Sequence, residues 1–382
     1  MWREMGKGLE RAWQRLVLEV LRVGCRAALM VRPLPVIDGK PPAPRSIVVF
    51  STAGIGDTLL DTPAIRALRE SFPACRITAV VHRRRQEMLA GNPHVDTLLP
   101  HRKGVVGFFR TLLAIRRAHP DAVVVLRAND PDIWPLAYLS GAPSLVGRPA
   151  STKFGFLINR PVPVPGWDDL HGVEAALAIV RELGAQTTDP RLVFRVSRAA
   201  RQRVQERLRA RGLDQTPLVA MQVHVSPRLT FRDWPAESFV VVGRAILRDY
   251  PVRLVLTGGK EDRAMGAMIQ QALGGGASCV AGDLCLSETA ALLEQCLALV
   301  TTDTGVMHLG FAVGVPTLAI LHPFNVHRFG PHGYGGRHQI VQFPGPVRDA
   351  SGQLRSLAEL PPDVVYAAFR EFVPREAAGR LA

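Results

Sequence analysis

The chain has 382 residues, which is enough for two domains of ordinary size, and 47% of them are hydrophobic, which excludes a mostly disordered protein. Its formal net charge of +14 calls for an anionic partner, such as nucleic acid, an acidic membrane surface or a phosphorylated substrate. Only 6% of the residues are aromatic, so surfaces on which nucleobases could stack are scarce.

Cysteine usage and the start of the chain indicate the compartment. The five cysteines are odd in number and form no C-x-x-C pair, which favours a reduced setting. No uninterrupted run of 18 apolar residues could span a bilayer, and glutamates at positions 4, 10 and 19 interrupt the apolar core that a signal peptide needs. We therefore expect a cytoplasmic protein.

Residues 8–31 are predicted to form one long amphipathic helix that ends before Pro33. Apolar side chains recur at helical spacing on one face, and several arginines lie on the opposite face. Two interpretations stay open, because such a helix with an aromatic anchor at Trp13 can lie on an anionic membrane surface, whereas an ordinary N-terminal helix packs on the protein. With the proline-rich stretch that follows, we assign residues 1–45 to a helix and a linker.

The first buried strand, residues 46–50, runs into a glycine-bearing turn and then a helix. The third glycine of a dinucleotide-binding fingerprint and the G-K-[ST] of a P-loop are both missing here, so neither site is indicated. Asp57, next to Gly56, would repel a phosphate but is well placed to accept a proton from a substrate hydroxyl. Alternatively, Asp57 is only the acidic residue that a helix N-terminus favours.

Strands and helices alternate through the rest of this half, which predicts a doubly wound α/β domain at residues 46–196. The predicted strands are 76–81, 95–99 and 122–126, and the predicted helices are 84–89 and 108–118. Asp130 and Asp132 form a D-x-D pattern of the kind that can hold a divalent metal. Because Pro131 interrupts it and no further acids support it, a loop with helix-capping acids is favoured and we expect no metal.

A second domain of the same architecture is predicted at residues 197–382. A strand-like segment at 192–196 and a charged helix over 198–211 lead into it. Its strands are expected at 218–223, 252–257, 279–281, 298–302 and 317–321, and its helices at 239–247, 284–296 and 361–372. Residues 323–336, rich in histidine and glycine, are expected to form a loop.

Residues 298–322 carry the densest functional signal. The strand breaks at Asp303, a helix follows, and Gly314 and Pro316 end that helix before the next strand, which makes one βαβ unit. At such a strand-to-helix turn, free N–H groups meet the positive end of the helix dipole. A phosphate or diphosphate is the ligand that this turn favours.

Three further residues add features that favour ligand binding at that turn. Gly305 allows close approach to the main chain, Thr304 adds a hydroxyl donor, and His308 lies one turn further along the helix, where its imidazole can point to the same place. In the alternative interpretation, Asp303 merely caps the helix and His308 is a satisfied interior histidine.

Ligands of open α/β sheets bind beyond the carboxyl ends of the strands. The first domain places Asp57 at that edge. The second places polar and glycine residues there: Ser226, Arg228, Gly258, Glu261, Asp303, Thr304 and His308. If the two edges face each other, they form a cleft with a candidate base on one side and anion-binding turns on the other.

In order and spacing, these motifs resemble glycosyltransferase family 9, whose best-known members are the ADP-heptose:lipopolysaccharide heptosyltransferases. The likeness covers most of residues 46–322. It is carried by Gly56-Asp57, Trp234-Pro235, Gly258-Gly259-x-Glu261, and Asp303-Thr304-Gly305-x-x-His308 followed by Gly314-x-Pro316-Thr317. The resemblance implies a GT-B fold, with two Rossmann-like doubly wound domains facing across a cleft, and an inverting mechanism that requires no metal.

The resemblance also implies roles for individual residues. Asp57 corresponds to the general base that deprotonates the acceptor hydroxyl, and Thr304 and Gly305 correspond to diphosphate contacts, with His308 close to them. Arg232 stands where heptosyltransferases commonly have lysine and is a cation suited to the leaving diphosphate. Glu261 resembles the acid that holds the nucleoside ribose.

Departures from the family pattern leave the donor open. His224-Val225-Ser226 replaces the usual turn after one strand, and Pro323-Phe324 replaces the usual G-P-T after another. These differences leave the identity of the sugar and of the nucleotide undecided.

We therefore expect an inverting glycosyltransferase that moves a heptose or a related sugar from a nucleotide-diphosphate sugar, ADP-heptose first of all, to a lipopolysaccharide-type or other cell-surface glycan acceptor. No cofactor beyond that co-substrate is expected. An anionic, membrane-anchored acceptor suits the basic surplus and the helix of residues 8–31, which places the protein at the inner face of the cytoplasmic membrane.

Two rival functions remain at this point. A GT-B-shaped nucleotide-sugar 2-epimerase would form product from the nucleotide sugar without any acceptor. A basic nucleic-acid-binding protein is disfavoured, because aromatic residues are few and no helix-turn-helix or zinc pattern is present. The sequence does not indicate the oligomeric state.

Overall fold

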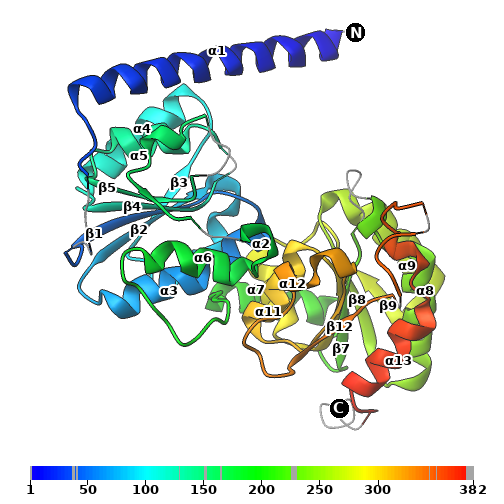
Figure 1. The fold of residues 1–382 in the computed structure, drawn as a ribbon. Helices are drawn as coiled ribbons and strands as arrows, with labels where there is room; N and C mark the ends of the chain where they lie inside the picture. The colour runs from blue at the N-terminus through cyan, green and yellow to red at the C-terminus, as the bar shows by residue number, and fades with distance from the viewer. Residues whose placement is uncertain are drawn as a thin grey trace. The chain divides into compact units, whose positions relative to one another are not determined.

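The computed structural model describes residues 2–36, 39, 42–128, 130–149, 153–163, 166–224, 230–343, 345–349 and 351–375, of which 2–16, 168 and 230 are described by their backbone alone. The chain divides into two compact units, each built on one six-stranded parallel sheet (Figure 1). The first unit comprises Met1–Trp167 and Val173–Thr188, and the second comprises Asp168–Gly172 and Asp189–Ala382. The expected doubly wound α/β architecture of both halves is confirmed.

The first sheet has the strand order β3-β2-β1-β4-β5-β6. Its strands are β1 Ser46–Ser51, β2 Arg76–His82, β3 Thr97–His101, β4 Ala122–Arg127, β5 Ser144–Gly147 and β6 Arg160–Pro161. The chain moves outward from β1 to β3 and returns to the other side of β1 as β4. The carboxyl ends of β1 and β4 therefore flank the point where the strand order reverses, which is where open α/β sheets bind ligands.

Helices cover both faces of this sheet, with α4 and α5 on one side and α3 and α6 on the other (Figure 1). The helices of this half are α1 Trp2–Val31, α2 Ile55–Leu60, α3 Thr62–Ser71, α4 Val105–Arg117, α5 Ile133–Leu139 and α6 Gly172–Arg181, with 3₁₀ turns η1 Arg83–Met88, η2 Gly155–Leu157 and η3 Trp167–Asp169. The apolar strands are buried on both sides, as parallel strands usually are.

The second half of α1 packs on this unit. Leu18, Leu21, Ala28 and Leu29 contact the core cluster of α4 and α5, and Cys25 is buried. This supports the packing interpretation for that half of the helix. The side chains of residues 8–16, which include Trp13, the aromatic anchor of the expected membrane contact, lie outside the described part. Within the described chain, no helix combines the length and the apolar character that crossing a bilayer requires.

The second sheet has the strand order β12-β11-β10-β7-β8-β9. Its strands are β7 Leu218–Gln222, β8 Arg253–Thr257, β9 Ala277–Cys279, β10 Cys296–Thr302, β11 Thr317–Ile320 and β12 His338–Val341. Here the order reverses between β7 and β10. The turns that follow these two strands are therefore neighbours at the carboxyl edge of the sheet.

The helices of this unit are α7 Arg198–Ala210, α8 Ala236–Asp249, α9 Arg263–Leu273, α10 Leu286–Leu293, α11 Gly305–Val313, α12 Val326–Phe329 and α13 Pro362–Phe372, and its 3₁₀ turns are η4 Thr230–Arg232, η5 Lys260–Asp262, η6 Gly274–Gly276, η7 Pro323–Asn325 and η8 Leu357–Glu359. Trp234 is fully buried, and its Nε1 donates to the Leu360 carbonyl at 3.1 Å. The Trp-Pro motif therefore anchors the core beneath α8 and α13.

Some elements differ from the sequence prediction. Residues 192–196, expected to be strand-like, form no strand in the described chain. The short strands β5, β6 and β12 and the helices α5 and α9 had no prediction. The loop expected at 323–336 contains η7 and α12.

Candidate active site

In the first unit, the turn after β1 holds Asp57 in a fixed position. The Gly54 N–H donates to Asp57 Oδ2 at 2.9 Å, and Thr58 Oγ1 donates to the Gly54 carbonyl at 2.8 Å. A Cβ at position 54 would lie 2.8 Å from Asp57 Oδ2, so glycine allows this close approach. The Asp57 side chain remains 35% exposed. Asp57 therefore caps α2, as one interpretation expected, and still offers carboxylate surface to a substrate.

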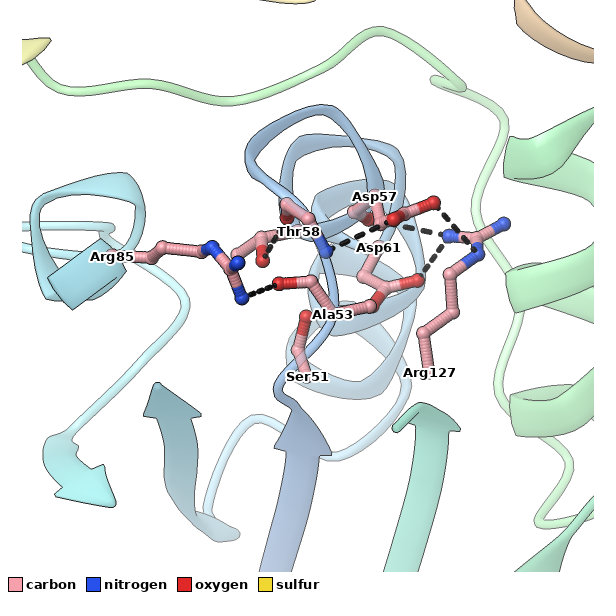
Figure 2. A network of polar contacts seen from close by, with 8 residues as sticks. Ser51, Ala53, Asp57, Thr58, Asp61, Arg85 and Arg127 are labelled. Carbon is pink, nitrogen blue, oxygen red and sulfur yellow. Dashed lines mark hydrogen bonds and ion pairs between the residues drawn. The ribbon is translucent and has the colours of Figure 1, made fainter. Parts of the chain in front are cut away.

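Arg127, at the end of β4, lies beside this carboxylate (Figure 2). Its Nε is 3.9 Å from Asp57 Oδ1, and its Nη1 donates to the Asp57 carbonyl oxygen at 3.3 Å. Parallel pairing of β1 and β4 sets Arg127 next to Ser51 and so brings a distant cation to the turn. These contacts help to hold the Asp57 carboxylate at the turn.

Asp61 lies beneath this pair and is fully buried. Ser51 Oγ donates to Asp61 Oδ2 at 2.6 Å, and Arg127 Nη1 forms a short ion pair with Asp61 Oδ1 (Figure 2). Burial raises the pKa of Asp61 to about 6, although Arg127 and the Ser51 hydroxyl act in the opposite direction. Arg127 is thus shared between a buried acid and a half-exposed one.

Arg85 approaches the same turn from η1, on the other side (Figure 2). Its Nη1 donates to the carbonyl oxygens of Thr52 and Ala53. Arg85 from η1 and Arg127 from β4 therefore hold the main chain on either side of Asp57. The sequence interpretation identified neither of them.

In the second unit, a helix starts directly after β10, as predicted. Thr304 is the N-cap of α11, and its Oγ1 accepts from the Met307 N–H at 3.4 Å. The N–H groups of Gly305 and Val306, in the first helical turn, donate to no backbone acceptor in the described chain. At the far end, Gly314 adopts φ +79°, the left-handed conformation that ends the helix. This helix start can bind a phosphate oxygen.

Asp303 positions Arg232 next to that helix start. Asp303 Oδ2 is 3.3 Å from Arg232 Nη1 and accepts from Asn325 Nδ2 at 2.8 Å. The guanidinium of Arg232 also lies over the Phe231 ring, 5.6 Å from its centroid. The carboxylate therefore does not simply cap α11, because it orients a cation that can face an anionic ligand.

The Gly258-Gly259 turn after β8 depends on close packing. A Cβ at Gly258 would lie 2.7 Å from Asp262 Cβ and 3.1 Å from the Val223 carbonyl oxygen, which explains the glycine. Asp262 Oδ2 accepts from the Gly259 N–H at 2.7 Å. Glu261 is exposed at this edge. Its position leaves its carboxylate available to a ligand hydroxyl.

His224 and Asp262 form a pair that the sequence interpretation missed. His224 Nδ1 lies 2.9 Å and 3.1 Å from the two oxygens of the buried Asp262 carboxylate. The hydrogen bond to Asp262 raises the pKa of His224 above its usual 6.5. His224 comes shortly after β7, and Asp262 lies in η5 after the neighbouring parallel strand β8. The position of both residues after predicted strands was the one signal in the sequence that could have revealed the pair.

His308 is 4% exposed and lies edge-on to the rings of Phe311 and Phe329. This placement supports the interior-histidine interpretation rather than a direct contact with a ligand.

Ser226 and Arg228, both expected at the donor edge, lie outside the described residues. The acids of the D-x-D pattern are also placed: Asp130 pairs with Lys103, and Asp132 Oδ2 is 3.6 Å from His101 Nε2.

Each unit thus presents one cluster at the carboxyl edge of its sheet. The first offers a fixed, partly exposed carboxylate flanked by arginines, which suits proton transfer from a hydroxyl. The second offers a helix N-terminus, an oriented arginine and an exposed acid, which suits a nucleotide diphosphate.

Comparison with known proteins identifies relatives of this chain. The family model for glycosyltransferase family 9 (heptosyltransferase) matches residues 144–344. The lipopolysaccharide heptosyltransferase 3 of Escherichia coli is 23% identical over 281 residues, which cover 69% of this chain and 80% of that protein. The lipopolysaccharide heptosyltransferase 2 of E. coli K12 is 24% identical over 292 residues, covering 72% and 82%.

Solved structures share the fold. A family 9 glycosyltransferase from Veillonella parvula superposes with a TM-score of 0.75 at 23% identity, over 86% of this chain and 97% of that one. The E. coli ADP-heptose lipopolysaccharide heptosyltransferase II gives 0.73 at 19% identity, over 87% and 100%. An E. coli heptosyltransferase, WaaC, with ADP-2-deoxy-2-fluoro heptose gives 0.63 at 17%, over 85% and 99%. These likenesses confirm the GT-B class of fold.

Proposed function

Because the chain belongs to glycosyltransferase family 9, we propose that it moves a heptose or a related sugar from a nucleotide-diphosphate sugar to a lipopolysaccharide-type acceptor. Its activity as a glycosyltransferase follows from the family. ADP-heptose is the first candidate donor, since one solved relative contains an ADP-heptose analogue and another is named as an ADP-heptose lipopolysaccharide heptosyltransferase.

The start of α11 is the proposed binding site of the donor diphosphate. Its open N–H groups and the positive helix end would hold the diphosphate, and Arg232, oriented by Asp303, would neutralise the charge that develops as the leaving group departs. Glu261 would accept a hydrogen bond from a ribose hydroxyl. His308 lies within α11 and is buried, so it would support the helix from the interior and would not contact the donor.

Asp57 carries the acceptor half of the proposal. The proposed step is a single displacement, in which the acceptor hydroxyl oxygen bonds to the sugar's anomeric carbon while the bond from that carbon to the diphosphate oxygen breaks. The hydroxyl proton passes to the Asp57 carboxylate, and the electron pair of the broken bond leaves with the diphosphate. Attack from the side opposite the leaving group inverts the anomeric centre. Arg127, whose Nε lies 3.9 Å from Asp57 Oδ1, would help to hold this carboxylate in place.

The proposal assigns no step to a metal ion, because Arg232 and the helix N–H groups supply the positive charge at the diphosphate. Transfer is therefore expected to continue in the presence of a chelator. We further propose that the protein works in the cytoplasm at the inner face of the membrane, where a lipid-linked anionic acceptor would be found.

Two measurements test this function. A thermal-shift series with ADP-, GDP-, UDP- and dTDP-sugars should show stabilisation by one nucleotide class, ADP-sugars first. The stabilising donor, mixed with a lipopolysaccharide core acceptor, should then give nucleotide diphosphate and a lengthened glycan only when the acceptor is present. A changed sugar formed from the donor alone would contradict transfer and favour an epimerase.

A further inference from the structure

The outward face of α4 is apolar where a surface helix would normally be polar. The side chains of Val105, Val106, Phe109 and Leu113 are 59%, 66%, 61% and 50% exposed. The opposite side of the helix, including Phe108, Leu112 and Ile115, is buried against the sheet. The four exposed residues form a continuous stripe at helical spacing, which we call the α4 stripe. A contiguous apolar patch of this kind marks an interaction site.

A basic hollow of about 620 Å³ lies beside the first turn of α4. Its cationic lining residues are Arg83, Arg102, Lys103 and Arg110, and no carboxylate lines it in the described chain. Gly107 fixes the loop on α4, because a Cβ there would collide with the Arg102 carbonyl. The cations are therefore held close to the α4 stripe by the fold.

Three of these four cations are available to a ligand. Lys103 pairs with the buried Asp130, whereas no acid of the described chain forms an ion pair with Arg83, Arg102 or Arg110. Arginines that converge on one hollow favour an anionic group such as a phosphate, because a planar guanidinium can contact two of its oxygens at once. A free phosphate ion would leave the α4 stripe exposed, whereas a lipid would cover it.

We propose that the α4 stripe and the basic hollow together form a docking surface for an anionic phospholipid membrane. The apolar side chains would enter the boundary between headgroups and acyl chains, and the arginines would contact lipid phosphates. Charge complementarity selects this occupant. A protein partner would need matching carboxylates, whereas an anionic leaflet supplies the negative charge and the apolar layer at once.

The location of the surface connects it with the proposed reaction. The hollow lies beyond the carboxyl ends of β2 and β3, at the same sheet edge as the Asp57 turn after β1. The short helix η1 carries Arg83 at the hollow and Arg85 at the Ala53 carbonyl. A bound membrane would therefore present lipid-linked sugars at the edge that carries the candidate base. This inference rests on the proposed function only for that last connection.

The test is vesicle co-sedimentation of the full-length protein, with no donor present. Phosphatidylcholine vesicles that contain phosphatidylglycerol should bind it, pure phosphatidylcholine vesicles should bind it weakly, and added salt should reduce the binding. Arg102→Ser with Arg110→Ser should weaken partitioning roughly thirtyfold, from the contribution of two cations near an anionic surface. Phe109→Ser with Leu113→Ser should weaken it at least roughly tenfold.

The matched control is Val241→Ser with Met268→Ser, which replaces two apolar side chains of similar exposure in the second unit. Its vesicle binding should equal that of the unchanged protein. Thermal unfolding and the thermal shift with ADP confirm that each variant is folded. If ADP fails to bind while vesicles still do, the proposed function fails and the docking surface stands.

Three outcomes would overturn the inference. Equal vesicle binding by the α4 variants and the unchanged protein would assign membrane contact to another segment, such as residues 2–16. Full competition by inorganic phosphate, with no effect of the apolar substitutions, would leave a simple phosphate site. If the α4 substitutions change the sedimentation of the protein without vesicles but do not reduce vesicle binding, the α4 stripe is a contact between two copies of the chain.

Discussion

Replacing Asp61 by asparagine tests the buried acid beneath the candidate base. Burial raises the pKa of Asp61 from 3.8 to about 6, and a shift of about two units corresponds to about 3 kcal/mol. The folded protein thus holds this proton more tightly than the unfolded chain does. The resulting stability is complete below pH 3.8 and is lost as the pH rises through about 6.

Asparagine has a similar shape and cannot ionise, so the substitution removes this pH dependence. The free energy of unfolding of Asp61→Asn, minus that of the unchanged protein, should therefore rise by about 3 kcal/mol between acidic and neutral pH. Below pH 4 both proteins carry a neutral side chain beside Arg127, so their difference there measures only the loss of the carboxylic acid's own hydrogen bonds.

Amide hydrogen exchange in β1 and β4 is the appropriate assay, because it reports the unfolding free energy of the first unit separately from that of the second. Asp96→Asn is the control, since the pKa of Asp96 is lowered and its contribution is constant above about pH 5. A stability difference for Asp61→Asn that does not change with pH would refute the reasoning. If that stability difference instead falls toward neutral pH, the effect of Arg127 on the pKa of Asp61 outweighs the effect of burial.

Three further predictions concern the second unit. Thr304→Val should weaken ADP binding in calorimetry by roughly tenfold, because a hydroxyl at the charged diphosphate is lost, and unchanged affinity would contradict the placement of the diphosphate at α11. Gly310→Ala should lower the free energy of unfolding, measured by chemical denaturation, by about 1–3 kcal/mol, because a Cβ there would lie 2.6 Å from Leu299 Cδ2. Gly275→Ala is the control, because a Cβ at that position would meet nothing within 4 Å. The His224 imidazole should titrate above 6.5 by NMR and return toward that value in Asp262→Asn, whereas an unchanged titration would mean that the pair does not form in solution.

The elements that sequence could predict are those whose signal is local. The turn at Asp303 and Thr304 follows an apolar strand directly and starts a helix, so its chemistry can be read from consecutive residues. The Asp57 turn has the same character. Strand β12 was missed because it is four residues long and follows a glycine-rich loop, which leaves too little pattern to indicate a strand.

The polar pairs that surround these turns could not be predicted, because they depend on which strands are neighbours. Arg127 reaches Asp61 only because β4 pairs with β1, and His224 reaches Asp262 only because β7 pairs with β8. The burial of His308 likewise depends on Phe329, which comes from a segment expected to be a loop. A charged residue at the end of an apolar strand, such as Arg127, was the one clue present in the sequence.

The most direct test of the account is a comparison of Asp57→Asn with the unchanged protein in two assays on the same sample. The account predicts that acceptor-dependent transfer falls by roughly 10²–10⁴-fold while the donor's dissociation constant stays nearly unchanged, because Asp57 accepts the acceptor's proton and does not hold the donor. Undiminished transfer, or lost donor affinity with normal turnover, would contradict it.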